Sequence, residues 1–265
     1  MEHDLAVAAL APIDDASTSW RERVVGRSLG PAADRAVERG QALIAAAGRL
    51  VQRDGEDFTM QQVAAEAGLS LRAIYQYFAG KDELLVALIE ESATVLTRLI
   101  DRAVAPYPDP LERLGAALTF MTDSRQHTDH AYNATMSRFV ARTWITEPEQ
   151  VGRARRQVTE RLRRLIEAAG EAGSIEAGDT TNQAACLSLA VTAYSMNVHL
   201  GSATGVPAPP NLEFVRFALL GLGARIPPGW EDRLQLSDAD AAHRRKTSER
   251  MAFASGPRRI RTRST

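Results

Sequence analysis

The segment from Thr59 to Lys81 constrains the fold more than any other, because it spells two short helices joined by a tight turn. Thr59 can cap the first helix, since its hydroxyl can accept a hydrogen bond from a free amide of the first turn. Gly68 follows that helix, where the chain needs the left-handed conformation that glycine adopts without strain. Ser70 can cap the second helix, which covers residues 71–77. The pattern is a helix-turn-helix, the unit that lays its second helix in the major groove of DNA.

The flanks of this segment extend the pattern. Residues 35–54 read as one amphipathic helix that ends at Gly55. A long helix should begin at Lys81, because Asp82 and Glu83 place negative charge in its first turn, as the helix dipole prefers. We expect this helix to run to about residue 104 and to link two parts of the protein.

The stretch from about residue 35 to residue 89, roughly a fifth of the chain, resembles the N-terminal domain of the tetracycline-repressor (TetR) family. The matching residues follow one another in order without a gap: Gly55, Phe58-Thr59, Val63-Ala64, Ala67-Gly68-Leu69-Ser70, Ile74-Tyr75, Tyr77-Phe78, Lys81 and Leu84-Leu85. The resemblance implies a three-helix head and a rear domain that binds a small molecule. It also implies that the last two helices pair with those of a second subunit as a four-helix bundle.

The rest of the chain also reads as helix, because β-branched runs are few and no Asn-Gly or Asp-Gly hairpin turn is expected there. We therefore expect an all-α fold, with an N-terminal three-helix head, a C-terminal six-helix bundle and nine helices in total. The expected parts are a flexible N-terminal arm (1–33), a helix-turn-helix DNA-binding domain (34–80), a helical effector-binding and dimerisation domain (81–228) and a basic, disordered tail (229–265).

The rear helices are expected near residues 110–121, 131–144, 148–172, 180–200 and 211–222. Residues 180–200 are apolar nearly all round, and such a helix must be buried on more than one side. This agrees with the homodimer contact that the TetR resemblance implies for the last two helices, residues 180–200 and 211–222. The helix at 148–172 should present a solvated face of arginines: Arg153, Arg155, Arg156, Arg161, Arg163 and Arg164.

Composition is that of an ordinary globular protein, with 265 residues, 45% hydrophobic and 25% charged, and a net charge of −1. Any affinity for nucleic acid must therefore come from a local surface. Cys186 is the one cysteine, and its apolar neighbours predict a buried, inert thiol; a reactive thiol is the alternative. Glu2 and Asp4 stand where a signal peptide would carry basic residues, and no apolar run suits a membrane span. We expect a cytoplasmic protein with no membrane partner.

Five residues of the head are expected to contact the DNA backbone and so to position the protein without reading sequence. Thr59 and Ser70 lie at helix N-termini, which favour phosphate. Tyr75 and Tyr77 can donate phenolic hydrogen bonds to phosphates, and Lys81 supplies a point charge.

Sequence should be read by side chains that project from the second helix. Arg72 can bind guanine through two hydrogen bonds, and Gln76 can pair with adenine. Leu71 and Ala73 can touch thymine methyl groups, and Gln61 of the preceding helix can also reach a base. Many TetR-family members carry Lys at the place of Leu71 and a small residue at that of Arg72. The shifted charge makes Arg72 the expected determinant of specificity.

Two alternatives remain open for these residues. Tyr75 can instead fill the small core with Ile74 and Phe78. Arg72 can be a solvated charge that reads nothing.

A ligand cavity is expected inside the rear bundle, lined by apolar side chains with a few polar ones. The candidates are Phe120, Met121, Asn133, Met136, Phe139, Trp144, Tyr194 and His199. Taken singly, each of them fits plain core better than a ligand contact. Their mixture of Met and aromatic side chains favours an apolar or aromatic effector.

Other motifs are weak. The Gly26-Arg27-Ser28-Leu29-Gly30 segment matches the nucleophile elbow of serine hydrolases, but Pro31 follows at once and no sheet is expected to seat it. His127 and His130, near Asp123 and Asp129, are better read as a wet helix end than as a metal site. We expect no catalytic residue, no metal and no cofactor.

These features predict a ligand-responsive transcriptional regulator, acting as a homodimeric repressor that binds a palindromic double-stranded DNA operator. An unknown small-molecule effector would release it. The alternative is an all-helical enzyme or small-molecule carrier that keeps a vestigial head. The basic tail can either add non-specific attraction to phosphate or be a solvated end.

Overall fold

The structure, a computed structural model, describes residues 19–21, 31–123, 130–146, 148–176, 178–201 and 207–234. All regular elements of these residues are helices, which confirms the all-α prediction. Their bounds are α2 (Pro31–Asp54), α3 (Met60–Glu66), α4 (Leu71–Tyr77), α5 (Lys81–Val104), α6 (Pro110–Thr122), α7 (His130–Thr146), α8 (Pro148–Glu171), α9 (Thr180–Leu200), α10 (Asn211–Gly221) and α11 (Trp230–Leu234).

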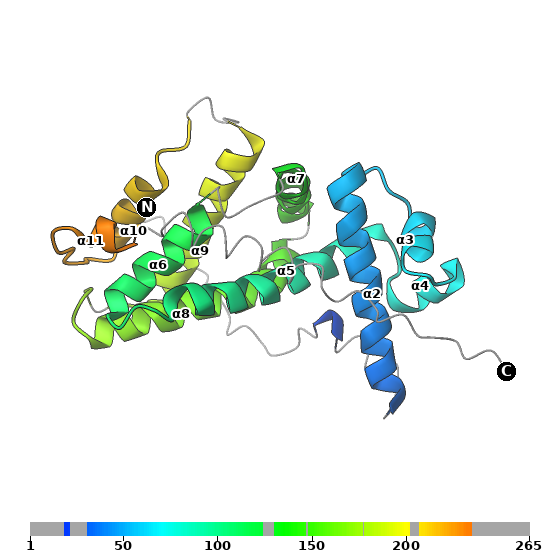
Figure 1. The fold of residues 1–265 in the computed structure, drawn as a ribbon, viewed down its shortest axis with the longest axis horizontal. Coiled ribbons are helices and arrows are strands. Elements are labelled where there is room, and N and C mark those ends of the chain that lie inside the picture. Colours follow the sequence, from blue (N-terminus) through cyan, green and yellow to red (C-terminus); the bar gives the residue numbers. More distant parts are fainter. Residues whose placement is uncertain are drawn as a thin grey trace, which may run out of the picture.

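Helix α5 joins the two ends of the molecule (Figure 1). Helices α2, α3 and α4 form the head around its beginning, and α6, α8, α9, α10 and α11 form the bundle toward its end. Helix α8 packs along α5, and α7 lies between the bundle and α2. No helix of the described residues is long and apolar enough to cross a membrane.

Most predicted helix bounds agree with the structure, and two differ. Helix α2 begins at Pro31 rather than near residue 35, because proline is well suited to a first helical position, where no intrahelical N–H bond is required. The tenth described helix, α11, lies at the start of the segment predicted to be a disordered tail. Trp230 and Leu234 of α11 are buried, and a Cβ added at Gly115 of α6 would lie 2.7 Å from Leu234 Cδ1. Glycine at that position lets α11 approach α6.

Two buried clusters divide the interior, and their division does not follow the expected boundary at residue 80. The rear cluster joins α6, the second half of α8, α9, α10 and α11 around Ile100 and Leu114. The head cluster joins α2, α3 and α4 to the start of α5, and it includes Phe139 of α7 and Val151 of α8. The core of the head therefore includes side chains of α7 and α8, which lie far from it in the sequence.

Three described residues of the predicted N-terminal arm are held in place. Trp20 is 2% exposed, and its ring lies against Gly40, where an added Cβ would be 2.7 Å from the ring. The backbone amide of Trp20 donates to Glu90 Oε2 at 2.7 Å, and Arg21 pairs with Glu91 at 2.7 Å. The prediction of a flexible arm therefore does not hold at residues 19–21. Residues 1–18 and 22–30 of the predicted arm, which include the Gly26–Gly30 motif, lie outside the described residues. The predicted tail from residue 235 also lies outside them.

The thiol of Cys186 is exposed, so the prediction of a buried thiol is wrong for the single chain. The error arises because α9 is apolar nearly all round, while only one side of it packs on the bundle.

We predict that Trp20→Ala destabilises the protein, because it removes a buried aromatic ring that packs against α2 at Gly40. Replacing a buried aromatic side chain by alanine typically costs about 3–5 kcal/mol in free energy of unfolding. Urea unfolding followed by circular dichroism measures the change at one fixed protein concentration. Ile145→Ala, at a side chain that is 85% exposed, is the control and should change stability by less than about 0.5 kcal/mol.

Candidate nucleic-acid interface and effector cavity

The first helix of the helix-turn-helix is fixed by a reciprocal cap. Thr59 Oγ1 accepts from the Gln62 amide at 3.2 Å, and Gln62 Oε1 accepts from the Thr59 amide at 2.7 Å. This is a capping box with Gln at its third position. The helix ends at a turn in which Gly68 has φ +68°, and the Leu69 amide donates to the Ala64 carbonyl at 2.8 Å. The predicted roles of Thr59 and Gly68 in the local fold are confirmed.

Helix α4 is buried along one side and free along the other. Ser70 Oγ accepts from the Ala73 amide at 3.2 Å, which confirms the predicted cap. Ile74 is fully buried, and Phe78 just beyond the helix is 1% exposed. The free side carries pairs of residues spaced four apart, which share a helix face: Leu71 with Tyr75, and Arg72 with Gln76.

The exposure of this face decides one of the two open alternatives. Tyr75 is 51% exposed and Leu71 40%, so Tyr75 does not fill the small core. Tyr77 and Ala73 are half-buried, and Tyr77 packs against the head cluster. Gln61 is exposed on the neighbouring helix. Arg72 is exposed and makes no hydrogen bond or ion pair with any other described residue, so its guanidinium is available to a ligand outside the chain.

Lys81 has an intramolecular role that its sequence position did not reveal. Its Nζ donates to the Glu56 carbonyl and lies 4.5 Å from the centre of the Phe58 ring. Arg142 of α7 pairs with the Glu56 carboxylate at 2.8 Å. The loop before α3 is thus tied to both α5 and α7. The contact of Lys81 with phosphate stays a prediction.

The eight residues predicted to line an effector cavity have different surroundings, and their contact with an effector stays a prediction. Phe120 and Met121 belong to the rear cluster, whereas Met136, Phe139 and Trp144 belong to or pack on the head cluster. Tyr194 packs against Phe214 at 4.6 Å between ring centroids, and its hydroxyl donates to the Pro209 carbonyl at 2.8 Å. His199 Nδ1 lies 3.4 Å from Ser137 Oγ, and Asn133 is half-buried. Burial, and then the charge of Asp123, raises the pKa of Tyr194. Of the eight, only Trp144 lines either of the two cavities described next.

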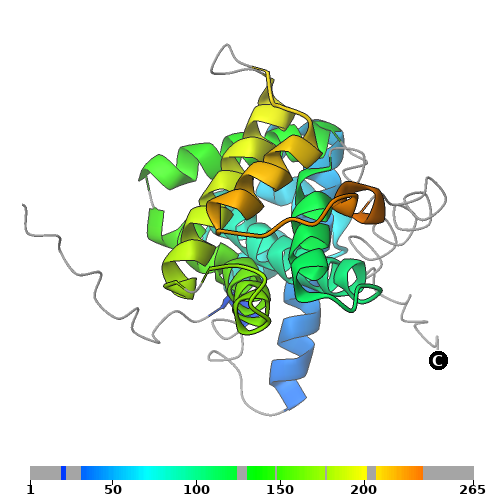
Figure 2. The ribbon, with the colours of Figure 1, turned by 90° about the vertical axis from the view of Figure 1, so that its left-hand side faces the viewer.

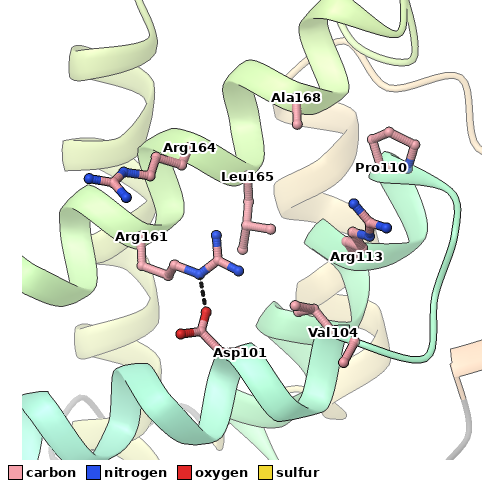
Figure 3. A pocket seen from close by; sticks show the side chains of 9 residues that line it. Asp101, Val104, Pro110, Arg113, Arg161, Arg164, Leu165 and Ala168 are labelled. Carbon is pink, nitrogen blue, oxygen red and sulfur yellow. Dashed lines mark hydrogen bonds and ion pairs between the residues drawn. The ribbon is translucent and has the colours of Figure 1, made fainter.

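One cavity, of about 280 Å³, lies between the end of α5, the start of α6 and α8 (Figure 3). Its charged groups are already engaged. Arg161 bonds Asp101, Arg113 donates to the Tyr107 carbonyl at 2.6 Å, and Arg164 pairs with Glu160 at 3.0 Å.

The second cavity, of about 220 Å³, lies between the end of α7, α8 and α9. Trp144, Val151 and Leu189 supply apolar walls, and Arg155 is the only charged residue that lines it. Burial lowers the pKa of the Arg155 guanidinium. Arg155 therefore does not belong to the predicted solvated face, and that part of the prediction is wrong.

No group of three or more His, Cys, Asp or Glu side chains that could hold a metal ion occurs among the described residues. His127 lies outside them, and the side chain of His130 is not described.

The head matches a known family in sequence. Residues 43–88 match the model of a family described as bacterial regulatory proteins, tetR family. The chain is 30% identical over 124 residues to the HTH-type transcriptional activator FasR of Mycolicibacterium smegmatis, a match that covers 47% of this chain and 55% of FasR. It is 44% identical over 69 residues to the HTH-type nicotine-responsive transcriptional repressor HdnoR of Paenarthrobacter nicotinovorans, over 26% of this chain and 36% of HdnoR. The head, over residues 43–88, is that of the TetR family.

The sequence matches of this chain span about half or less of the length of these two curated relatives. The fold similarity extends further. RolR in complex with resorcinol superposes with a TM-score of 0.56 at 18% identity, over 83% of this chain and 96% of RolR. FadR of Bacillus subtilis in complex with stearoyl-CoA superposes with a TM-score of 0.53 at 15% identity, over 71% of this chain and 99% of FadR. At these identities the structures show that the fold is shared.

Arg155 is the functional candidate that sequence reasoning missed. It lies four residues after Val151 and three before Val158, both fully or nearly fully buried, so helical periodicity places it beside the apolar stripe of α8. That spacing was the available signal, and it was hidden by the other arginines of the same helix.

We predict that Thr59→Ala loosens the start of α3 in this TetR-family head. Loss of a threonine cap typically costs about 1 kcal/mol. Hydrogen exchange of the Gln62 amide should quicken, because that amide loses its hydroxyl partner. Thr59→Ser keeps the hydroxyl and should retain protection, and equal exchange in both variants would contradict the role of the cap.

Proposed function

We propose that this chain is a ligand-responsive DNA-binding transcriptional regulator, a homodimeric repressor that leaves a palindromic operator when a small molecule binds its rear domain. The observation that carries the proposal is the free side of α4. A helix capped at its start and packed through Ile74 presents Arg72, Tyr75 and Gln76 outward. A recognition helix must combine a rigid base with exposed groups that can donate and accept hydrogen bonds.

Within this proposal the residues of the head divide by role. Arg72 would read guanine and Gln76 adenine, with Leu71, Ala73 and Gln61 adding contacts to neighbouring bases. Thr59, Ser70, Tyr75, Tyr77 and Lys81 would hold the DNA backbone. Lys81 would have to keep or exchange its bond to the Glu56 carbonyl, so of the five it is the one whose phosphate contact competes with an internal one.

The free apolar faces of α9 and α10 support a homodimer. Leu189 is 51% exposed, Phe217 76% and Leu220 52%. Ala185 and Ala193 are exposed on α9 and are small enough for another helix to approach closely. The two helices are neighbours (Figure 2), joined by the stacked rings of Tyr194 and Phe214. To bind two half-sites on one face of the duplex, a dimer formed through this surface must hold its recognition helices about 34–36 Å apart, one turn of DNA.

Release by an effector requires that the ligand bind two arrangements of the dimer with different affinity. Helix α5 is the physical link, because its first half belongs to the head cluster and its second half to the rear cluster. Repression is the proposed mode of regulation; of the relatives above, FasR is named an activator and HdnoR a repressor. A cytoplasmic location follows from the need to reach the chromosome.

The alternative is an all-helical enzyme or carrier with a vestigial head. The intact caps and the unpaired Arg72 of α4 favour a working head. The test is whether the purified protein retards DNA from its own upstream region at moderate salt. An absence of binding there and in selection from a random DNA pool would count against the proposed regulator.

We predict that Arg72→Ala relaxes sequence preference and costs about 1–3 kcal/mol on the preferred site. Selection of bound DNA from a randomised pool measures the preference, and titration of one labelled site measures the affinity. Tyr77→Phe should instead weaken binding to all sequences about equally. Arg156→Ala, an exposed arginine of α8, controls for loss of charge alone. An unchanged preference in Arg72→Ala would remove its role as a reader.

We predict that Phe217→Glu converts the dimer to a monomer, because a carboxylate would be buried without a partner. Sedimentation velocity measures the mass, and affinity for a palindromic site should fall together with dimerisation. Ile145→Glu places the same charge on another exposed apolar residue and should leave the mass unchanged. A dimer that survives Phe217→Glu would show that α10 is not its contact.

A further inference from the structure

The cavity between α7, α8 and α9 combines apolar walls with one arginine, Arg155, that has no charge partner among the described residues. Arg155 makes no hydrogen bond or ion pair with any other described residue, although it is half-buried. Four other arginines of α8, Arg153, Arg161, Arg163 and Arg164, pair with carboxylates, whereas Arg156 has no such pair but is exposed to solvent. A bound anion could pair with the half-buried guanidinium of Arg155 through charge-assisted hydrogen bonds.

The polar groups on the α8–α9 wall of the cavity are already used by one another. Thr159 Oγ1 donates to Ser188 Oγ at 3.0 Å, and Thr192 Oγ1 donates to the Ser188 carbonyl at 2.7 Å. They leave Arg155 as the group that can fix the polar end of a ligand. Trp144, Val151 and Leu189 offer a flat ring and two aliphatic side chains to the rest of it.

We propose that this cavity is the effector site, and that it takes a small monocarboxylic acid whose aromatic or short aliphatic body lies against Trp144 while its carboxylate pairs with Arg155. That the bound acid acts as an effector rests on the proposed function. A carboxylate matches the guanidinium with two parallel hydrogen bonds, which a neutral group cannot do. A volume of about 220 Å³ is below the usual range for drug-sized ligands, so it favours a molecule of one or two rings.

The position of the cavity gives a route to the head. Val151 faces the cavity and also belongs to the head cluster with Leu84 and Leu88 of α5. Ala185 and Leu189 line the cavity from the exposed side of α9, where the second copy of the proposed dimer would pack. A ligand in this cavity would touch Val151, which packs in the head cluster, and Ala185 and Leu189, which lie in the proposed contact between subunits.

Calorimetry on the full-length protein, without DNA, tests the proposal. Benzoate, cinnamate and naphthoate are each compared with their neutral amides. At least one acid should bind the wild type about tenfold to a hundredfold more tightly than its amide, as expected for a hydrogen-bonded charge pair. Arg155→Gln should abolish that preference, and Arg156→Gln, at the exposed neighbour, should keep it.

A second variant guards against a folding defect at Arg155. Gly152 lines the cavity from α8, and a Cβ added there meets nothing within 4 Å. Gly152→Leu should therefore fold while filling the cavity, and it should weaken the bound acid and its amide alike. Thermal unfolding verifies that both variants are folded.

The proposal is overturned if no acid binds saturably, if acids and amides bind the wild type equally, or if Arg156→Gln loses the preference as Arg155→Gln does. An acid that binds unchanged to Gly152→Leu would place it elsewhere and also overturn the proposal. DNA binding by the ligand-free wild type is measured separately. Its failure would contradict the proposed regulator while the calorimetric result still decides what the cavity binds.

Discussion

The packing of α5 is the constraint on which the rest of the structure depends. A surface helix normally buries one stripe, but residues 84–89 of α5 are all buried, so the start of this helix is enclosed on every side. Farther along, Ile100, Ala103 and Val104 enter the rear cluster. One rigid helix therefore belongs to two cores. Neither core can repack without shifting a helix that the other also holds.

The enclosure of α5 depends on parts of the chain that are distant in sequence. Trp20 reaches it from the N-terminal side, and α7 and the start of α8 cover it with Phe139 and Val151. Arg142 of α7 adds a bond to the loop before α3. The head thus rests on the segment that also walls the cavity of Arg155. In the proposed regulator, ligand binding and DNA reading would therefore be joined by direct packing rather than by a flexible connection.

The parts of the fold that sequence could predict are those set by local interactions. The caps at Thr59 and Ser70 and the turn at Gly68 each involve residues within five positions, so the pattern of residue types fixes them. The bond of the Trp20 amide to Glu90 spans 70 positions, and nothing at either residue signals the other. The same holds for Lys81 and Glu56. The helix-turn-helix was therefore predictable in detail, whereas its supports were not.

The effector region shows the limit of residue type as a guide. Phe120, Met121 and Phe139 have the composition of a ligand cavity, but buried cores use the same side chains, and here they fill the two clusters. A charge on the apolar side of a helix is a rarer signal. Arg155 carried that signal in its spacing from Val151 and Val158.

The exposed position of Cys186 gives the protein a built-in attachment point. The chain has a single cysteine, and it lies on the open side of α9. A spectroscopic label fixed to that sulfur would occupy one defined position per molecule, without any engineered residue. In the proposed homodimer the second copy would cover this side of α9, so the rate at which the thiol reacts with a label would report how much of the protein is unpaired. The sequence thus already contains a chemical probe of its own assembly.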